Sequence, residues 1–150
     1  MREILFRGQT RRKGERIINM AGDKCDSNWV YGGIFPQNEE EKGFAVIYQQ
    51  EPEIKKYSVY ADTVCQYTEV DDKNGKNIFH KDIVSAPFTG YVGKKHTRIG
   101  VVEYVKGAFC VNWNDSEEYG KNFLGYVNDI EVIGNVFDNP ELLKEDAENA

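Results

Sequence analysis

Short runs of β-branched and aromatic residues, separated by polar turn segments, recur along the whole chain. The clearest runs in the first half are WVYGGIF (29–35) and FAVIYQ (44–49), with the polar stretch EEEKG between them. Runs of this kind are typical of strands joined by a turn or a flexible loop. A third run, SVYADTVCQYTEV (58–70), is interrupted at residues 61–63, where we expect a bend or a short helical turn.

The second half of the chain repeats this pattern with clearer turn signals. IFHKDIVSA (78–86) predicts a strand, and RIGVVEYVKGAFCVNW (98–113) predicts two strands joined at Lys106-Gly107. Asp-Lys-Asn-Gly (72–75) predicts another tight turn, because an Asn-Gly pair readily adopts positive φ. The segment 87–96, with one proline and two glycines, predicts a loop. The candidate core of this half is the apolar set Val101, Val102, Tyr104, Phe109, Val111, Ile130, Val132 and Ile133.

Two further signals lie near the C-terminal end. Gly134 predicts a bulge or a close approach of two backbone segments. Asn139 followed by Pro140 predicts the start of a helix, because Asn caps helix N-termini and Pro fits the first helical position. The pattern therefore predicts a mainly β protein with a short C-terminal helix. The tight turn predicted at residues 72–75 suggests a division of the chain into residues 1–70 and 71–150, which could also fold as one unit.

The composition supports a packed β protein and limits its functions. The 150 residues are 40% hydrophobic and 13% aromatic, which is too rich for a disordered chain. A net charge of −6 disfavours non-specific nucleic-acid binding as the main role. The charge is uneven, with a local +4 in residues 1–16 and a local −4 in both 37–53 and 138–150. Such blocks are usually solvated, but they also offer complementary surfaces to a second copy, so we expect a homo-oligomer.

The cysteines predict a cytoplasmic protein without disulfides or zinc. Cys25, Cys65 and Cys110 are odd in number, and no CxxC or CxxH pattern occurs. Two of them lie in apolar runs, where a thiol acts as a small buried hydrophobe in a reducing compartment. No apolar stretch approaches the ~18 residues of a membrane span, and the first residues lack a signal-peptide core. We therefore expect no membrane contact.

No motif identifies a reaction or a cofactor. VDDKNGKNIFHK resembles a calcium loop, but it places Val70 and Lys81 where acidic ligands are needed. His80 with Asp82 could form a general base, yet no nucleophile pattern accompanies them. The twenty-five acidic residues allow the paired carboxylates of a hydrolase but single out no pair. We therefore predict no catalytic residue, no metal and no cofactor.

The candidate binding residues are cations near aromatic side chains. GKKHTR (93–98) carries four cations when His96 is protonated, and the N-terminal segment is also basic. Aromatic residues in and beside the C-terminal strands could stack on bases, although the alternation along residues 101–113 places several of them in the core. The candidate binding residues are Arg11, Arg12, Lys13, Tyr91, Lys94, Lys95 and Arg98.

Five blocks in a fixed order carry a family signature: MREILFRG (1–8), WVYGG (29–33), TVCQYTEVDDKNGKNIFHKDIV (63–84), GVVEYVKGAFCV (100–111) and EVIGNVFDNPELL (131–143). Together they resemble the YopX family of phage and prophage proteins, of the SPbeta-prophage type. The chain departs from the family pattern at Glu69, where glycine is usual after Q-Y-T. It departs again at His80-Lys81, where Glu-Gly usually precedes Asp-Ile-Val.

This resemblance implies a small, mostly β protein whose C-terminal part is an SH3-like barrel or roll, preceded by a β-rich extension. It also implies a gene carried by phages or prophages. It implies no activity and no site residues, because the family has no established biochemical function. We therefore expect a non-enzymatic accessory protein that binds a host or phage protein. One alternative is a nucleic-acid-binding protein that uses the basic N-terminus and the barrel aromatics, and another is a carboxylate-based hydrolase.

Overall fold

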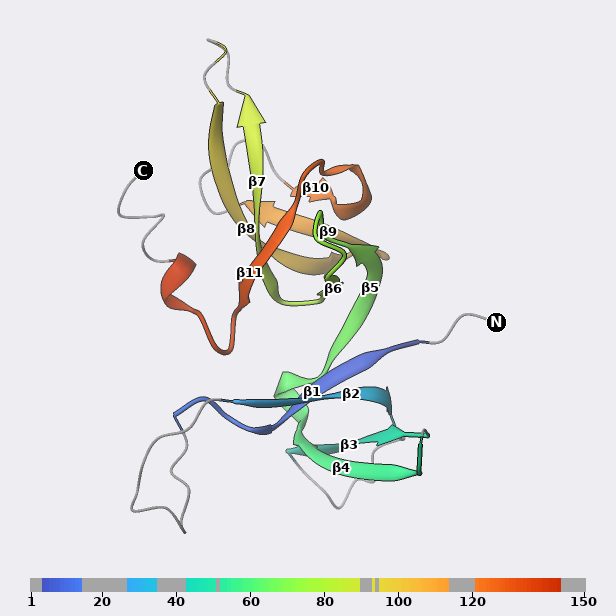
Figure 1. The fold of residues 1–150 in the computed structure, drawn as a ribbon. Coiled ribbons are helices and arrows are strands. Elements are labelled where there is room, and N and C mark those ends of the chain that lie inside the picture. Colours follow the sequence, from blue (N-terminus) through green and yellow to red (C-terminus); the bar gives the residue numbers. More distant parts are fainter. Residues whose placement is uncertain are drawn as a thin grey trace. The chain divides into compact units, whose positions relative to one another are not determined.

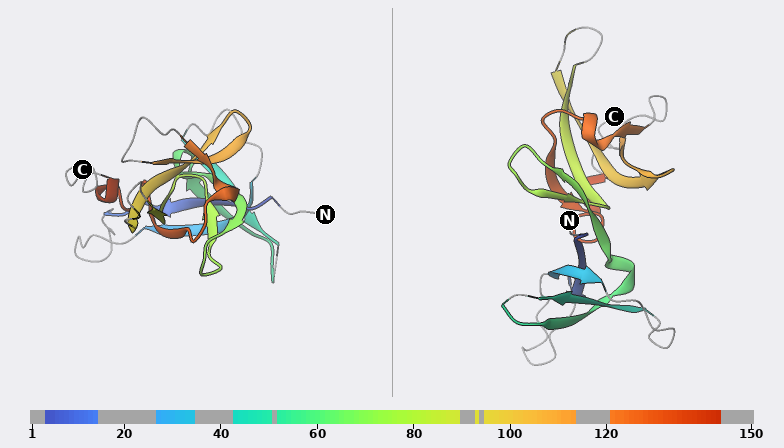
Figure 2. Two further views of the ribbon diagram at one scale, coloured as in Figure 1. Left: turned by 90° about the horizontal axis from the view of Figure 1, so that it is seen from above. Right: turned by 90° about the vertical axis from the view of Figure 1, so that its right-hand side faces the viewer.

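The computed structural model describes residues 4–14, 27–34, 43–50, 52–89, 93, 95–113 and 121–143. The chain forms two compact units, Met1–Tyr67 (unit 1) and Thr68–Ala150 (unit 2), which are drawn in Figures 1 and 2. The described residues of both consist mainly of antiparallel strands, which confirms the mainly β class. The division into parts that fold independently stays a prediction.

Unit 1 is built on antiparallel strands in the order β4-β3-β2-β1-β5. The strands are β1 (Phe6–Arg11), β2 (Asn28–Ile34), β3 (Phe44–Gln49), β4 (Lys55–Tyr60) and the first part of β5 (Cys65–Asp71). Strands β2 and β3 confirm the runs predicted at 29–35 and 44–49. The EEEKG segment between them lies outside the described residues, apart from Gly43.

The small core of unit 1 is closed by strands that are not neighbours in the sheet. Val30, Ala45, Ile47 and Val59 are buried there. A Cβ placed on Gly8 of β1 would lie 2.7 Å from Cγ2 of Val59 on β4, three places away in the strand order. The sheet therefore curls back on itself, and only glycine permits this approach of β1 to β4.

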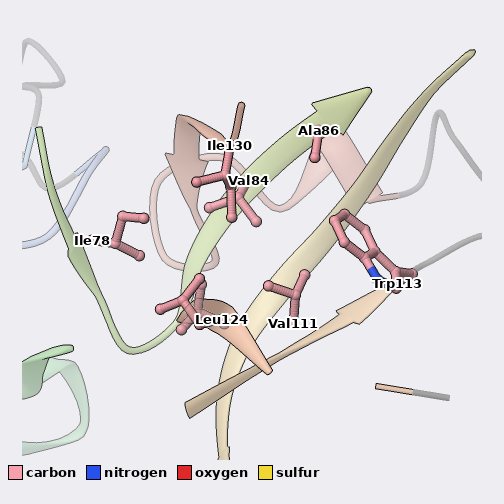
Figure 3. Close-up of a cluster of buried hydrophobic side chains, with 8 residues drawn as sticks. Ile78, Val84, Ala86, Val111, Trp113, Leu124 and Ile130 are labelled. Carbon is pink, nitrogen blue, oxygen red and sulfur yellow. The ribbon is translucent and has the colours of Figure 1, made fainter. Parts of the chain in front are cut away.

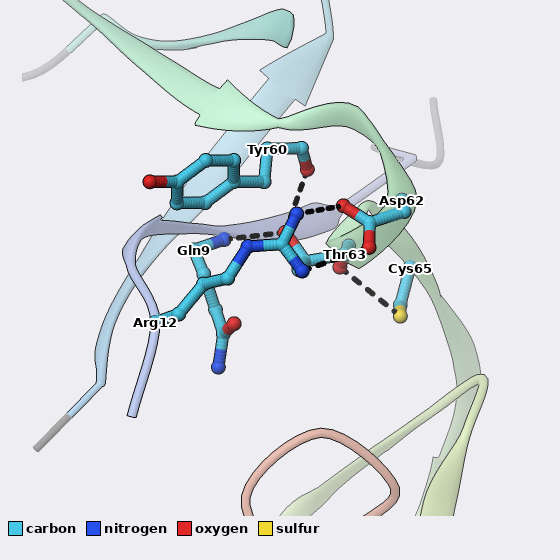
Figure 4. A network of polar contacts seen from close by, with 6 residues as sticks. All are labelled: Gln9, Arg12, Tyr60, Asp62, Thr63 and Cys65. Atoms are coloured by element: carbon cyan, nitrogen blue, oxygen red, sulfur yellow. Dashed lines mark hydrogen bonds and ion pairs between the residues drawn. The ribbon is translucent and has the colours of Figure 1, made fainter. Parts of the chain in front are cut away.

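A 3-10 turn, η1 (Ala61–Thr63), follows β4, as the interruption in the third run predicts. Thr63 is fully buried and its hydroxyl has two partners. It donates to the carbonyl of Tyr60 at 2.7 Å and accepts from the backbone N–H of Gln9 on β1 at 2.9 Å (Figure 4). The turn is thus joined to β1 by a buried hydrogen bond.

A second, exposed contact joins the same turn to the end of β1. The guanidinium of Arg12 forms a two-pronged ion pair with Asp62, with N–O distances of 2.8 and 3.0 Å (Figure 4). Arg12 also lies over the ring of Tyr60, 4.1 Å from its centroid. The hydrogen bond to Asp62 is the largest of the effects that raise the pKa of Arg12 above its ordinary value.

Unit 2 is built on a five-stranded antiparallel sheet in the order β10-β9-β8-β7-β11. Its strands are β7 (Asp82–Thr89), β8 (Lys95–Val105), β9 (Ala108–Trp113), β10 (Lys121–Phe123) and β11 (Glu131–Asn135). A short strand β6 (Asn77–Phe79) pairs with β5, and the 3-10 turn η2 (Leu124–Tyr126) follows β10. The residues predicted as a loop at 87–96 are partly strand, because β7 and β8 continue their pairing as far as Thr89 and Lys95.

The hairpin between β8 and β9 has the turn that the sequence predicts. Lys106 and Gly107 are its two central residues, with φ values of 50° and 86°, between the paired residues Val105 and Ala108. Both central angles are those of the two-residue turn that matches the twist of antiparallel strands.

The sheet of unit 2 is open in its strand order, with β10 and β11 at its edges (Figure 1). The described residues of this unit include no closed barrel. The mainly β prediction is therefore confirmed, whereas the barrel expected from the family resemblance is not found in this part of the chain.

The core of unit 2 gathers on one face of this sheet (Figure 3), and its buried members are Ile78, Val84, Ala86, Val102, Val111, Trp113, Leu124 and Ile130. Three of the eight predicted core positions are thus buried, and Phe109 and Val132 pack against the cluster. Val101 and Ile133 are half-buried. Tyr104 was expected in the core but is 57% exposed. It pairs with Phe109 next to the turn of the β8–β9 hairpin, and the two rings meet edge-on with centroids 5.1 Å apart.

The predicted tight turn after β5 is fastened by the buried carboxylate of Asp72. One oxygen accepts hydrogen bonds from the backbone N–H groups of Asn74 and Lys76, both at 2.9 Å, and the other accepts from Val132 of β11 at 3.0 Å. Burial opposes ionisation, but these hydrogen bonds together outweigh it and lower the pKa of Asp72. Gly75 has the expected positive φ, 79°, whereas Asn74 does not, so the left-handed conformation is confined to the glycine.

Glu69 and Lys81 both have a φ of 68°, in the left-handed region that favours glycine. These are positions at which the family resemblance implies glycine. A side chain in this region costs about 1–2 kcal/mol relative to glycine. This chain therefore keeps a glycine-like backbone conformation at Glu69 and Lys81 despite their side chains.

The C-terminal segment confirms the bulge and shows one helical turn. The register of β11 against β7 shifts between Val132 and Gly134, and a Cβ on Gly134 would lie 2.5 Å from Oδ1 of Asn139. That oxygen accepts from the N–H of Asn135 at 3.2 Å, so the side chain of Asn139 fastens the bulge. A helical turn at 141–143 follows, and the rest of the predicted helix lies outside the described residues.

The buried thiols are divided between the units. Cys65 belongs to unit 1 and is 1% exposed, and Cys110 belongs to unit 2 and is 7% exposed. Both are buried, as their apolar surroundings in the sequence predict. Cys25 lies outside the described residues.

Candidate binding cleft

Unit 2 contains a cleft of about 420 Å³ beside the C-terminal end of β7 and the N-terminal end of β8. Three regions line it: the end of β7, the start of β8, and the segment that runs from β10 towards β11. The described lining residues are Ala86, Pro87, Phe88, Thr89, Lys95, Arg98, Trp113, Asn122, Tyr126, Val127, Asn128 and Asp129. Aromatic rings and two cations therefore share one concave surface.

Arg98 is held in the wall of this cleft by aromatic rings. It pairs with Ala86 of β7, so it lies on the face of the sheet that carries the core, and it is only 5% exposed. Its guanidinium carbon lies 4.8 Å from the ring centroid of Phe88 and 4.8 Å from that of Trp113. Cation–π contacts of this kind stabilise by about 0.5–2 kcal/mol each, more when desolvated. The two rings therefore restrict the orientation of the guanidinium.

Trp113 is itself fixed at the end of β9. The side chain is 5% exposed, and its indole N–H donates to Oδ1 of Asn122 on β10 at 2.6 Å. The ring is buried and its polar group is satisfied, so Trp113 forms a packed part of the cleft wall.

Exposed aromatic rings form the rim of the cleft. Phe88 is 43% exposed and Tyr126 is 83% exposed. Phe88 meets the ring of His96 edge-on, with centroids 5.2 Å apart, and Tyr126 meets Phe123 with centroids 6.3 Å apart. Large apolar rings left in solvent around a concave surface are typical of an interaction site.

Lys95 supplies the second cation of the cleft. It is exposed at the start of β8 and makes no ion pair within the described residues. Lys121 of β10, by comparison, lies 3.2 Å from Glu103. Among the described lining residues, Asp129 is the one carboxylate beside the two cations Lys95 and Arg98.

The structure brings two of the seven predicted binding residues, Lys95 and Arg98, into this cleft. Arg11, Arg12 and Lys13 belong to unit 1, where the charge of Arg12 is already balanced by Asp62. Tyr91 and Lys94 lie outside the described residues.

The two rings of the rim could not be recognised from the sequence pattern. Phe88 follows a proline in a segment predicted as a loop, and Tyr126 lies in η2, outside every predicted strand. The available signal was the occurrence of large aromatic residues in turn-rich segments, where a core position is not expected. Neither residue type nor spacing showed that both would line one cleft together with Arg98.

His80 and Asp82, the candidate general base, lie between β6 and the start of β7. Asp82 is 1% exposed and accepts a hydrogen bond from the N–H of Phe79 at 2.8 Å, which fixes the entrance to β7. The ring of His80 lies 6.3 Å from that of Phe109, beside a second cleft of about 410 Å³. The described residues lining that second cleft include no Ser, Thr or Cys nucleophile.

The described part of the chain offers neither a cluster of metal ligands nor a membrane-spanning helix. No three His, Cys, Asp or Glu side chains gather there as metal ligands. Nor does any helix there have the length and apolar character needed to cross a membrane.

The fold and the cleft define a mainly β protein with two antiparallel sheets and an aromatic cleft that bears cations. Among solved structures, the crystal structure of protein EF1440 from Enterococcus faecalis is similar, with 19% sequence identity and a TM-score of 0.45. The match covers 95% of this chain and 99% of that one. The family model described as YopX protein matches residues 21–144, and the chain therefore belongs to the YopX family. No match was found among curated proteins. The family resemblance is thus confirmed, and the SPbeta-prophage type stays a prediction.

Proposed function

We propose that this protein is a non-enzymatic accessory protein of phages or prophages that acts in the host cytoplasm. It binds a host or phage protein through the cleft of unit 2. The observation that carries this proposal is the exposed aromatic rim of Phe88 and Tyr126 around a concave surface, in whose wall Arg98 lies between Phe88 and Trp113. Arg and aromatic residues in preformed, well-packed surfaces supply most of the energy of protein interfaces.

The chemistry of the cleft supports binding over hydrolysis. A carboxylate-based hydrolase needs two acidic groups within roughly 5–9.5 Å of each other. Asp129 is the one acidic residue among the described lining residues, which also include no His or Cys.

One observation favours nucleic acid as the alternative ligand. Lys95, His96 and Arg98 follow one another along β8 near the ring of Phe88, and single strands bind to cations combined with stacking rings. The net charge of −6 opposes a polyanion, and Arg12 of the basic N-terminal block is balanced by Asp62. Protein is therefore the favoured partner.

The topology supports an SH3-like roll for unit 2. Strands β7 to β10 follow one another as a meander, and β11 returns to pair with β7. Small β rolls of this type present grooves to peptides, although that link is an analogy from the fold.

The opposed charge blocks support a homo-oligomer as well. Light scattering across working concentrations should return a multiple of the mass of one chain. The mass of a single chain at all concentrations would contradict this part of the proposal.

The test of the function is affinity capture of the tagged protein from phage-infected or lysogenic cells, with mass spectrometry and nucleic-acid analysis. Wild type is compared with Phe88→Ala/Tyr126→Ala. The control is Phe44→Ala on unit 1, because Phe44 is 44% exposed and Phe88 43%. Circular dichroism verifies the folding of each variant.

Partner proteins should be retained by wild type and by Phe44→Ala, and lost from the cleft variant. Equal retention by the cleft variant would contradict the proposed site. Retention of DNA or RNA that falls steeply with salt near physiological ionic strength would favour the nucleic-acid alternative.

A further inference from the structure

We infer that Asn74 is a site of spontaneous covalent modification, at which the asparagine of the turn after β5 converts to aspartate and isoaspartate. Asn74-Gly75 is the one Asn-Gly pair in the sequence, and both of its residues are exposed. The reaction needs no enzyme and does not depend on what the cleft of unit 2 binds.

The reaction is an attack within the chain by the residue that follows the asparagine. The backbone nitrogen of Gly75 loses its proton to solvent hydroxide and bonds to Cγ of Asn74, while the side-chain amide takes up a proton and leaves as ammonia. Water then opens the resulting succinimide ring at one of its two carbonyl groups. One opening gives aspartate, and the other gives isoaspartate, whose main chain passes through Cβ and Cγ. Nucleophile and carbonyl belong to adjacent residues, so water is the one further reactant.

Glycine at position 75 leaves the attacking nitrogen accessible, because it has no Cβ to shield it. A Cβ built there would meet no heavy atom within 4 Å beyond its chain neighbours, so the surrounding space is open to water and hydroxide. Asn77, at the start of β6, is exposed as well. The β-branched side chain of Ile78 follows it, however, and crowds the corresponding nitrogen. Asn77 is therefore a matched internal control.

Two hydrogen bonds restrain the reaction in the folded protein. The N–H of Gly75 donates to the carbonyl of Asp72 at 3.0 Å, and Nδ2 of Asn74 donates to Oε1 of Glu131 at 3.4 Å. The first engages the attacking nitrogen, and the second holds the side-chain amide towards β11. Because Asn74 and Gly75 are exposed, a local opening of the turn releases both without unfolding of unit 2. Conversion is therefore slower in the native protein than in the unfolded chain.

Conversion weakens the attachment of the turn to β11. Both products replace the amide donor by a carboxylate, which faces the carboxylate of Glu131. Isoaspartate also lengthens the main chain between the N–H groups of residues 74 and 76, which both donate to Asp72. The geometry of these hydrogen bonds is therefore lost in isoaspartate.

The attached segment leads directly into the cleft. The N–H of Lys73 donates to the carbonyl of Ile130 at 2.8 Å, and Asp72 accepts from the N–H of Val132 at 3.0 Å. The residues immediately before Ile130, Tyr126 to Asp129, line the cleft. Modification of Asn74 therefore loosens one wall of the cleft from a distance.

The test is incubation of the full-length protein at neutral and mildly alkaline pH, followed by proteolysis and mass spectrometry that distinguishes aspartate from isoaspartate. Asn74 should convert roughly tenfold faster than Asn77, because glycine leaves the nitrogen unshielded. The rate should rise with pH, because the nitrogen must lose its proton. The same chain unfolded in urea gives the rate without the turn.

Three variants separate the chemistry from the restraint, after circular dichroism has verified their folding. Gly75→Ala should slow conversion roughly tenfold, although it strains the turn, so the slowing cannot result from a more stable turn. Glu131→Ala removes the acceptor of the Asn74 amide and should speed conversion roughly twofold. The control Glu103→Ala removes another glutamate that pairs with a lysine, on β8, and should leave the rate unchanged.

The converted protein is separated by its additional negative charge, and hydrogen exchange is measured for the amides of residues 126–132. Exchange there should be faster than in fresh protein, and Asn74→Asp, which adds the charge without altering the main chain, should show a smaller increase. Unchanged exchange in the converted protein would overturn the effect on the cleft wall. The site itself would be overturned if native Asn74 stays intact while the urea-unfolded chain converts, or if Asn74 converts no faster than Asn77.

Discussion

Units 1 and 2 each use an aspartate to join a turn to a strand far away in the sequence, but in different surroundings. In unit 1, Asp62 of η1 pairs with Arg12, and their side chains are 58% and 44% exposed. In unit 2, Asp72 is 7% exposed and accepts backbone hydrogen bonds, one of them from Val132, 60 residues later. The same residue type therefore closes one connection in water and the other in the protein interior.

This difference teaches that burial decides what each aspartate contributes. An exposed ion pair gains about 0–1 kcal/mol, because water competes for both partners. Loss of a buried acceptor leaves its donors without partners. Each donor that water cannot reach then lowers the stability by about 1–3 kcal/mol. The units should therefore respond very differently to matched substitutions.

The largest effect is expected for Asp72→Ala, which removes the acceptor of three backbone N–H groups. Unit 2 should lose roughly 2–4 kcal/mol of stability. The chain has two Trp residues, Trp29 in unit 1 and Trp113 in unit 2. Urea unfolding can therefore be followed by Trp113 fluorescence in a Trp29→Phe background. A loss as small as that of Asp62→Ala would remove the contrast between the units.

Acidification should affect unit 2 through Asp72. The pKa of Asp72 is lowered in the folded state. The contribution of its carboxylate to the stability of unit 2 is therefore fully present above the unfolded-state pKa of about 3.9, and it disappears as the pH falls through the lower folded-state pKa. Stability measured by Trp113 should fall below about pH 4. Asp72→Asn should flatten this part of the profile, and an unchanged slope would show that other carboxylates cause it.

Residues with positive φ offer substitutions that should stabilise unit 2. In the described parts of unit 1, positive φ occurs at Gly14 and Gly43, whereas in unit 2 it also occurs at four residues with side chains: Glu69, Lys81, Lys106 and Asp129. Glu69→Gly and Lys81→Gly should each raise the stability of unit 2 by about 1 kcal/mol, measured by urea unfolding. Lys76→Gly is the control, because its φ is not positive, and it should lower stability. Losses in all three variants would show that these side chains stabilise unit 2 more than their conformation costs.

Gly75→Ala should act in the opposite direction. The φ of 79° is strained for alanine, and no atom lies within 4 Å of an added Cβ, so the loss of about 1 kcal/mol is purely conformational. The matched variant Gly125→Ala also places its Cβ in open space, but without positive φ. Thermal unfolding should separate the two variants, and equal melting temperatures would contradict the conformational explanation.

The smallest effect is expected in unit 1. Arg12→Ala and Asp62→Ala should each lower stability by roughly 0.3–1 kcal/mol, and moderate salt should reduce the loss. A double-mutant cycle, followed by hydrogen exchange of β1 and β4 amides, isolates the energy of the pair. A coupling energy above about 2 kcal/mol would place this pair in the same class as a buried one.

The local part of the fold could be predicted from the sequence. Gly75 and Gly107 specify tight turns because glycine tolerates positive φ, and Gly134 marks a real bulge. Strand β1 was missed, because FRGQTR has neither alternation nor an apolar run. Its place depends on η1 and β4, which come about fifty residues later in the chain.

The cleft could be predicted only in part, because it depends on strand register. Lys95 and Arg98 were found as cations in a basic segment, but a charged side chain in such a segment is expected in solvent. Arg98 is buried because the registers of β7 and β9 bring Phe88 and Trp113 to its two sides. Contacts between residues on three strands leave no periodicity in the sequence.

The two buried thiols, one in each unit, allow the opening of each unit to be measured through the reactivity of its cysteine. A thiol 1% or 7% exposed reacts with an alkylating reagent mainly when the structure around it opens. In a Cys25→Ser chain, the labelling rate of Cys65 then follows unit 1 and that of Cys110 follows unit 2. After correction for the rates in the unfolded chain, each tenfold ratio corresponds to about 1.4 kcal/mol of opening free energy. A ligand held at the cleft should slow the labelling of Cys110 alone, so the thiol detects binding by a molecule whose identity has still to be determined.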